Sequence, residues 1–253
     1  YQIVSKLNSS FQGWGFQIFS DMKLGAYLAN DWDGNLIFTK TTQSLSADNI
    51  WHHVVLTYNG SADASGVYIY IDGSATDQDP ANNTNSLNAT ITNDANLWIG
   101  AYDPGYEYFK GQMDEVAIWN SALTASEITA LYYSGSPLDA TSNSGDYTSS
   151  SNLIGYWRFE ENSGTTAYDL SGNGNYGTIN GATYSTDVPL QPAISFSITG
   201  TSGFRMLSSP VSGNIYADLL EELWTQGMAG SDDPNHGASN VWTRSSSSSS
   251  WQA

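Results

Sequence analysis

Residues 67–71 read Val-Tyr-Ile-Tyr-Ile, and Asp72-Gly73 follows them directly. Aliphatic residues alternate with tyrosines here, and this period of two predicts a β-strand whose aliphatic face enters a core. Aspartate followed by glycine is a turn signal, so the strand is expected to end at this point. The same pattern, a short apolar run closed by turn residues, recurs along the chain.

Further strands are expected on both sides of this one. β-branched and aromatic residues gather in short runs, with turn signals such as Asp33-Gly34 and Asn59-Gly60 between them. The runs are residues 15–19, 24–28, 36–39, 51–58, 97–99 and 113–119. Short strands at this spacing are typical of two antiparallel sheets packed as a sandwich.

One helix is expected after the last of these strands. Thr124 and Glu127 have the spacing of a capping box, in which each side chain bonds the other residue's backbone and starts a helix. Ile128 and Leu131 then fall on one face, and Gly135 follows as a stop signal. We expect this helix to pack its apolar face on the sandwich.

The composition narrows the function classes. The chain of 253 residues carries 7 Lys and Arg residues against 25 Asp and Glu residues, a net charge of -18. Such a surface repels phosphate backbones and anionic membranes, which argues against nucleic-acid binding, and the acidity serves solubility, gathers divalent cations, or does both. No apolar run is long enough to span a membrane, so no membrane insertion is expected in this fragment. The absence of cysteine excludes disulfides and thiolate metal sites.

Four motifs follow one another in order: residues 51–60 (WHHVVLTYNG), 67–73 (VYIYIDG), 97–100 (LWIG) and 109–120 (FKGQMDEVAIWN). Together they resemble the C-terminal two-thirds of a laminin-G-like domain, over about residues 1–135. The resemblance implies an all-β fold, a two-sheet antiparallel jelly-roll sandwich of the concanavalin A-like type with one short helix. Members of this family are usually extracellular and bind glycans, proteins or calcium, or accompany carbohydrate-active enzymes, so no single activity is implied.

Residues 155–178 resemble the segment that usually opens such a domain, although here they follow its body. Either this segment folds back and completes the sandwich of residues 1–137, or it begins a second copy whose body is missing. We favour the first alternative, because an opening strand without partners would leave an unpaired edge. Residues 138–152 are then a linker or long loop, and residues 153–190 complete the sandwich.

Residues 191–253 are expected to begin a second, β-rich domain that is truncated at its C-terminal end. Residues 203–242 resemble a module of large secreted proteins of Bacteroidetes-like bacteria, near their C-terminal sorting regions. This resemblance implies an extracellular, cell-surface or secreted location. Because the chain opens at Tyr1 and closes on a low-complexity serine run, both ends are expected to be cuts through a longer protein.

A calcium site is expected in the displaced segment. Asp169, Ser171 and Asn173 carry side-chain oxygens at alternate positions, and the backbone carbonyl of Asn175 continues the series. A tight loop with this spacing wraps oxygens around calcium, which takes six to eight of them. The resemblance adds Asp114, because related sandwiches often use an aspartate of the corresponding late strand. The alternative is a glycine- and asparagine-rich turn without metal, but we expect a structural calcium ion.

Aromatic residues on strands and loops of the sandwich suit sugar binding. Sugars stack their apolar faces on aromatic rings, while Asp and Asn bond their hydroxyl groups. The candidate ligand-binding residues are Tyr68, Tyr70, Tyr102, Asp103, Tyr106 and Tyr108, and Trp32 belongs to the same exposed set. For Tyr68 and Tyr70 the alternative is a half-buried outer face, since tyrosine suits strands in general.

The sequence offers little for catalysis. It lacks the closely spaced carboxylates that concanavalin-type glycosidases place on one strand as acid and nucleophile. The acids at 114–115 and at 160–161 are adjacent, and adjacent residues of a strand point to opposite faces. His52 and His53 lack zinc-ligand spacing, so a structural role is expected for both. The chain is therefore not expected to be an enzyme.

These observations predict a non-catalytic extracellular binding or structural module of a large bacterial surface protein, stabilised by calcium. Its expected partners are a glycan or a surface protein, and other copies or domains of the same protein. The alternative is an accessory carbohydrate-binding domain of a secreted polysaccharide-degrading enzyme, whose catalytic part lies outside these residues.

Overall fold

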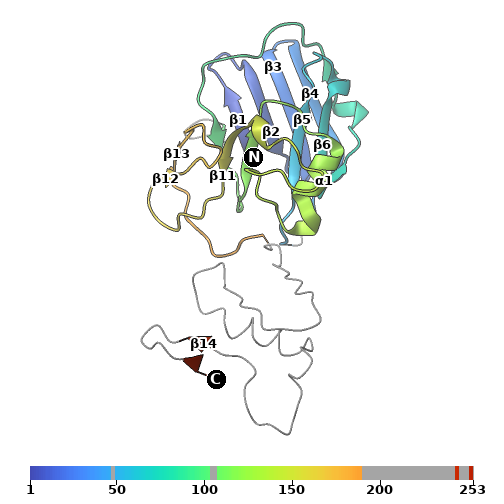
Figure 1. Ribbon diagram of the computed structural model, residues 1–253. Helices are drawn as coiled ribbons and strands as arrows, with labels where there is room; N and C mark the ends of the chain where they lie inside the picture. The colour runs from blue at the N-terminus through green and yellow to red at the C-terminus, as the bar shows by residue number, and fades with distance from the viewer. Residues whose placement is uncertain (47–48, 103–106, 190–242, 245–250, 253) are drawn as a thin grey trace. The chain divides into compact units, whose positions relative to one another are not determined.

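The computed structural model describes residues 1–46, 49–102, 107–189, 243–244 and 251–252. The chain divides into two units, Tyr1–Ile194 and Ser195–Ala253. In the second unit only β14 (Thr243–Arg244) and β15 (Trp251–Gln252) are described, and they pair antiparallel. The expected second domain therefore lies almost wholly outside the described residues, and its boundaries stay a prediction. Figure 1 shows the first unit in colours that run from blue to orange along the chain.

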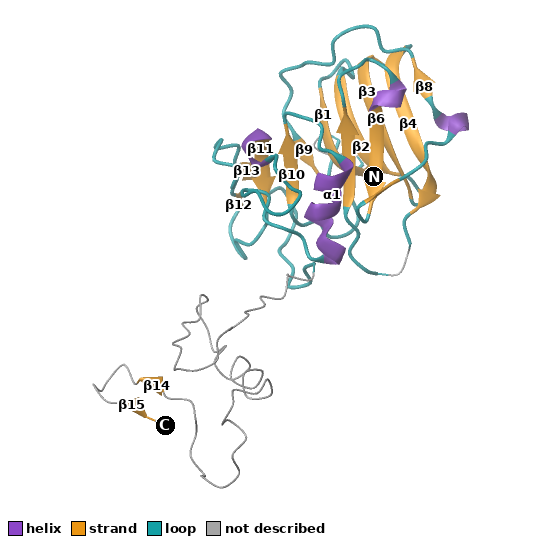
Figure 2. Ribbon diagram, turned by 45° about the vertical axis from the view of Figure 1, so that its right-hand side comes forward, coloured by secondary structure: helices purple, strands orange, loops and turns teal. Residues whose placement is uncertain are grey.

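A six-stranded antiparallel sheet forms one layer of the first unit (Figure 2). Its strands lie side by side in the order β8-β4-β3-β2-β1-β9. Their bounds are β1 Gln2–Leu7, β2 Gly13–Ile18, β3 Lys23–Asp31, β4 Asn35–Ser44, β8 Thr84–Asn85 and β9 Trp98–Ile99. Because β1 to β4 pair consecutively and antiparallel, the β1–β2 loop and the β3–β4 loop lie at the same end of the sheet.

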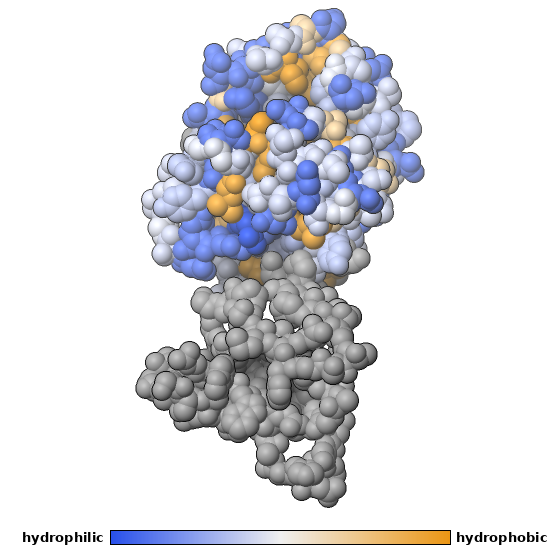
Figure 3. All heavy atoms as spheres, viewed as in Figure 1, coloured by the Kyte–Doolittle hydropathy of each residue, from blue (hydrophilic) through white to orange (hydrophobic). Residues whose placement is uncertain are grey.

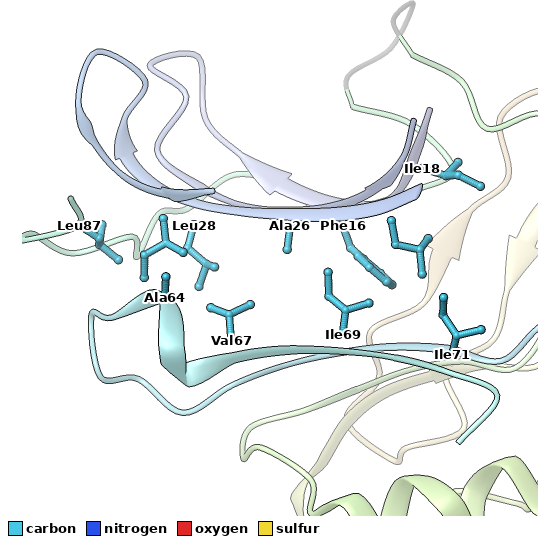
Figure 4. Close-up of a cluster of buried hydrophobic side chains, with 11 residues drawn as sticks. Phe16, Ile18, Ala26, Leu28, Ala64, Val67, Ile69, Ile71 and Leu87 are labelled. Carbon is cyan, nitrogen blue, oxygen red and sulfur yellow. The ribbon is translucent and has the colours of Figure 1, made fainter. Parts of the chain in front are cut away.

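The facing layer contains β5 (Val54–Tyr58), β6 (Val67–Ile71) and β7 (Ser74–Ala75), which pair antiparallel in that order. The aliphatic side chains of β6 point at those of β2 and β3 across the core (Figure 4). Val67, Ile69 and Ile71 are all buried, as the alternation in the sequence predicted. The core between the two layers confirms the expected sandwich.

The expected helix is α1 (Ala125–Tyr132), and its capping box between Thr124 and Glu127 is confirmed. The described residues also form four short 3-10 helices: η1 Ala64–Gly66, η2 Pro80–Asn82, η3 Tyr133–Gly135 and η4 Ser150–Asn152. Within the described residues, no helix is both long and apolar enough to cross a membrane. The chain leaves α1 at Tyr133, which has a left-handed backbone conformation.

A second core lies beneath α1. It gathers buried residues from β6, the helix, the segments before and after the helix, and β11: Tyr70, Leu123, Ile128, Leu131, Ala140, Tyr147, Leu153 and Tyr156. The carboxylate of Glu127 also accepts hydrogen bonds from the hydroxyl of Ser149 at 2.5 Å and from the backbone N–H of Thr148 at 3.2 Å. Residues 138–152, for which a linker or a loop was expected, are thus a loop packed against the helix.

The displaced segment pairs with the body of the domain. β11 (Leu153–Trp157) lies antiparallel to β10 (Val116–Trp119), with Ala117 opposite Tyr156. Two short strands follow, β12 (Thr166–Ala167) and β13 (Gly177–Thr178), and they pair with each other. The segment therefore finds a strand partner within residues 1–120.

Candidate functional site

The outer face of the six-stranded sheet carries a tyrosine laid across a glycine. Phe16 and Ala26 face the core, so their chain neighbours Gly15 and Tyr27 face outward, where they are register partners. A Cβ atom built on Gly15 would overlap the Tyr27 hydroxyl, which shows how closely the ring lies on the strand. The hydroxyl accepts a 2.6 Å hydrogen bond from Nε2 of Gln2, and burial raises the pKa of Tyr27. Tyr27 is therefore a fixed, buried support.

Trp32 rests on this support at the tip of the β3–β4 loop. Its ring meets the Tyr27 ring edge-on, with centroids 5.4 Å apart and an interplanar angle of 79°. The backbone N–H of Asp33 donates to the side chain of Asp31 at 3.0 Å and tightens the loop. Trp32 is still 49% exposed. One side of the indole is therefore held by protein, and the rest is open to solvent.

Phe11 stands in the β1–β2 loop, at the same end of the sheet as Trp32. Its backbone has a φ of 61°, a left-handed conformation that is uncommon for a bulky residue. The Asn8 side chain holds this conformation, because its oxygen accepts the N–H groups of Ser10 at 2.9 Å and Gln12 at 3.0 Å. Although it is aromatic, Phe11 is 47% exposed. Backbone strain that presents an apolar ring to solvent often marks a functional position.

The rings of Phe11, Trp32 and Tyr102 lie next to one another, and we call these three residues the aromatic platform. Phe11 is central, with its ring centroid 6.4 Å from that of Trp32 and 6.1 Å from that of Tyr102. The Phe11 and Tyr102 planes differ by 23°. Each ring comes from a different connection, and Tyr102 follows β9. Three loops thus converge on one exposed aromatic surface.

Of the tyrosines expected to bind a ligand on β6, only one is available. Tyr68 is 49% exposed on the outer face of the strand. Tyr70 is 7% exposed and packs in the second core with Ile128 and Leu131 of α1. The helix covers this end of the face, so the expectation for Tyr70 is corrected: it is a core residue and offers no ring to a ligand.

The other expected ligand residues follow β9. Tyr102 belongs to the aromatic platform, and Tyr108 is exposed. Asp103 and Tyr106 lie outside the described residues. The sequence also pointed to Trp32, but it gave no signal for Phe11, since a lone aromatic in a Ser- and Gln-rich turn has no periodicity.

The Asp169 carboxylate is bound by the chain's own backbone. Its Oδ1 accepts the N–H groups of Tyr156 at 3.0 Å and Ser171 at 2.9 Å, and its Oδ2 accepts the N–H of Asn175 at 2.8 Å. Asp169 is 6% exposed. Burial alone would raise its pKa, but the hydrogen bonds outweigh burial and hold the pKa of Asp169 below its usual value. The side chain therefore fastens its loop to β11.

Two more of the oxygens expected to bind calcium, those of Asn175 and Ser171, also accept hydrogen bonds. The backbone carbonyl of Asn175 accepts the indole N–H of Trp157 at 2.9 Å. The hydroxyl oxygen of Ser171 accepts the side-chain amide of Asn173 at 3.0 Å, and that amide also donates to the carbonyl of Leu153. The carbonyl of Asn175 and the hydroxyl of Ser171 thus bond to protein donors.

Asp114 does not join this loop. Its carboxylate accepts the N–H of Glu115 at 2.9 Å, and among the described residues no hydrogen bond links it to Asp169. Burial raises the pKa of Asp114 to about 6. No group of three or more acidic or histidine side chains that could hold a metal ion occurs in the described residues. The structure thus does not bring Asp114 together with the Asp169 loop, and the calcium site, which needs six to eight oxygens, stays an untested prediction.

The acids next to β10 form a separate charged cluster. Glu115 precedes the strand with a left-handed φ of 53°, so the expectation that residues 114–115 alternate along a strand is corrected. Its carboxylate accepts the Tyr156 hydroxyl and pairs with the guanidinium of Arg158 at 3.0 Å. Arg158 also pairs with Glu160 at 2.7 Å. Glu115 is therefore neutralised by a cation and is not a free general base.

The two histidines lie before β5 and take part in packing. The imidazole of His53 stacks on Tyr132 of α1 with centroids 5.9 Å apart, and burial lowers the pKa of His53 to about 4. His52 pairs through Nδ1 with Asp72 at 2.9 Å, and Asp72 also accepts the N–H of His53. These contacts tie the residues before β5 to the β6–β7 turn.

A family model described as the Concanavalin A-like lectin/glucanases superfamily matches residues 1–129, which is 129 of the 253 residues. The chain belongs to this superfamily, and the resemblance to laminin-G-like domains is confirmed. The match ends before β11 begins. No curated protein matches the chain. Membership is compatible with a binding module, while the superfamily's name covers both lectins and glucanases.

Proposed function

We propose that the first unit is a non-catalytic module that binds glycans through the aromatic platform. The observation that carries the proposal is the convergence of three rings from three loops on one surface, with Phe11 and Trp32 each about half exposed. Soluble domains rarely leave grouped aromatic rings open to water unless a ligand covers them. Covering the open half of each ring contributes about 1 kcal/mol per ring.

The contacts that support Trp32 and Phe11 suit a binding surface. Tyr27 holds the Trp32 ring edge-on, and the Asn8 turn fixes the backbone at Phe11, so part of the ordering is already present before a ligand binds. Rings that are fixed in advance lose little conformational entropy on binding. Sugar rings have apolar faces that stack on aromatic rings, and this chemistry favours a glycan as the ligand.

The ionisable groups favour a non-catalytic role. Glycoside hydrolysis needs two carboxyl groups on either side of the scissile bond. Glu115 is paired with Arg158, while Asp169 and Glu127 are saturated by hydrogen bonds from their own surroundings. These carboxylates therefore have structural work in the fold.

The location and wider context belong to the same proposal. Residues 203–242 resemble modules of large secreted bacterial proteins, which supports an extracellular or cell-surface position. A second candidate role is that of an accessory carbohydrate-binding domain of a polysaccharide-degrading enzyme, because the superfamily's name includes glucanases. The same platform would hold the substrate in either context, with a surface protein or another copy of the chain as a further partner.

An array of neutral and anionic glycans, probed with the purified chain, tests the proposal. Wild type should bind, and Trp32→Ala should weaken binding about tenfold or more, because aromatic anchors dominate binding free energy. Tyr133→Ala is the matched control, since Tyr133 is about as exposed as Trp32 but lies in η3 and not in the loops of the aromatic platform. Binding that is unchanged in Trp32→Ala, or an array without a binder, would contradict the proposal.

A further inference from the structure

The loops of the aromatic platform have one sign of charge. Residues 8–12, 30–35 and 101–102 contain no Lys, Arg or His, whereas Asp31 and Asp33 flank Trp32 on both sides. The whole chain has a net charge of -18. The negative charge of these loops would repel a uronate or sulfate group on a ligand, and their residues offer no cation to pair with it. The charges therefore select against acidic glycans.

The polar groups near the rings differ in how free they are. The side-chain amides of Gln12 and Asn30 both donate to the carbonyl of Thr90, and that of Asn35 donates to Asn88. The carboxylate of Asp33, by contrast, accepts no hydrogen bond from the described residues and is exposed. A carboxylate only accepts at neutral pH, so it suits ligands with hydroxyl donors. Neutral sugars present many such groups.

The rings lie in an open arrangement. Phe11 lies between Trp32 and Tyr102 with centroid distances of 6.4 Å and 6.1 Å, and the outer two rings extend the surface on either side. Phe11 and Trp32 stand at hairpin tips, and both remain about half exposed. A surface of this kind contacts the faces of several linked sugars, whereas recognition of a chain end needs a cavity that encloses one sugar.

We infer that the aromatic platform binds the interior of a neutral polysaccharide chain, with Asp33 accepting hydroxyl groups from the sugar that stacks on Trp32. This inference rests on the proposed function and names its ligand class. A basic peptide is the other occupant that an acidic, aromatic surface could take. The polysaccharide is favoured because the Phe11 and Tyr102 rings are stacked on each other, with planes 23° apart, whereas a cation is held best by ring faces that surround it.

The experiment is affinity electrophoresis and calorimetry of the purified chain with named probes. The neutral probes are hydroxyethylcellulose, galactomannan and laminarin, and the charged probes are polygalacturonate and oligolysine. At least one neutral polymer should bind, and neither charged probe should. Affinity should rise from the monosaccharide to the hexasaccharide of the polymer that binds. Sodium chloride between about 0.05 M and about 0.5 M should change it little, because no ion pair forms.

Variants separate the inference from the proposed function. Asp33→Ala should weaken binding to the neutral polymer several-fold, Trp32→Ala should weaken it about tenfold or more, and Tyr133→Ala should leave it unchanged. Circular dichroism and thermal unfolding confirm that each variant folds. The inference is overturned if polygalacturonate or oligolysine binds more tightly than the neutral polymers, or if the monosaccharide binds as well as the hexasaccharide. In either case the proposed function, binding by the aromatic platform, would still stand. If Trp32→Ala changes binding of none of the probes, the proposed function itself fails.

Discussion

The aromatic platform and the Asp169 loop differ in what their interacting groups contact. In the platform, Phe11 and Trp32 are supported from one side and leave about half of their surfaces open. In the loop, both oxygens of Asp169 accept backbone N–H groups, and the carbonyl of Asn175 accepts an indole N–H. The first region has capacity left for a ligand. The second uses its polar groups to hold the fold together.

This difference shows why residue spacing alone is a weak predictor of a cation site. Oxygens at alternate positions indicate a tight loop, and a tight loop also directs its own N–H groups inward. At Asp169 two of those N–H groups, together with that of Tyr156, donate to the carboxylate that was expected to bind a cation. A ring at a hairpin tip has no comparable internal partner. Its exposure therefore says more about binding than a pattern of oxygens does.

The largest expected effect on stability is that of Asp169→Ala. Three N–H donors lose their acceptor, and buried donors without partners cost about 1 kcal/mol or more each, so the free energy of unfolding should fall by about 3 kcal/mol. Asp169→Asn keeps one acceptor oxygen and should lie between wild type and Asp169→Ala. Urea unfolding measures the effect. If the free energy of unfolding falls by less than about 0.5 kcal/mol, the Asp169 carboxylate does not hold its loop to β11.

Acid should weaken the contact between α1 and the loop that precedes β11. Burial alone would raise the pKa of Glu127, but hydrogen bonds from Ser149, Thr124 and Thr148 lower it to about 2. Because the folded pKa lies below the ordinary value of 4.5, the stabilisation is complete above about pH 4.5 and is lost as pH falls toward 2. Lowering the pKa from 4.5 to about 2 corresponds to about 3 kcal/mol. The expected contribution is about 2 kcal/mol, because solvent screens part of the interaction.

Unfolding free energies of wild type and Glu127→Gln across this pH window measure that contribution. The difference between the two should shrink as the wild-type carboxylate becomes protonated. A difference that stays constant from neutral pH to about pH 3 would contradict the assigned hydrogen bonds.

Asp114 should act in the opposite direction and more weakly. Burial raises its pKa to about 6, so the charged carboxylate opposes folding at neutral pH, and this cost disappears below the ordinary pKa of 3.8. Asp114→Asn should therefore stabilise the protein at pH 7 by about 1 kcal/mol and have no effect near pH 3. Thermal unfolding at both pH values tests this. Destabilisation at pH 7 would show that the charge has a partner, such as the expected cation.

The smallest expected effect is that of calcium. With its oxygens bound to backbone and indole N–H groups, the Asp169 loop should give the same melting temperature in excess calcium and in chelator. A ligand at a hundredfold its dissociation constant would stabilise the fold by about 2.7 kcal/mol, which thermal unfolding resolves easily. An increase that Asp169→Ala abolishes would establish the site that the sequence predicted.

Much of the fold could be predicted from local patterns. The alternation in residues 67–71 and the capping box of Thr124 and Glu127 are both confirmed, because each depends on neighbours in the chain. β1 was missed, since polar Gln2, Ser5 and Lys6 interrupt its apolar residues. These side chains find partners far along the chain, such as the carbonyl of Ala101 for Ser5.

The platform could be predicted only in part. Trp32 and Tyr102 were expected to be exposed, because aromatic residues in polar loops have few neighbours to bury them. Phe11 depends on a left-handed turn fixed by Asn8, and sequence patterns do not report that conformation. The sequence does not distinguish Tyr70 from its exposed neighbour Tyr68, but in the structure α1 covers Tyr70. Contacts between distant elements decided both cases.

The most direct test compares Trp32→Ala and Asp169→Ala in two assays on the same preparations. One assay measures affinity for the neutral polysaccharide that wild type binds, and the other measures the free energy of unfolding in urea. Trp32→Ala should lose about tenfold or more in affinity but less than about 1 kcal/mol in stability, and Asp169→Ala should lose stability while its folded fraction keeps the wild-type affinity. The reverse pattern, in which Asp169→Ala abolishes binding at full stability and Trp32→Ala binds normally, would contradict the assignment of binding to the platform.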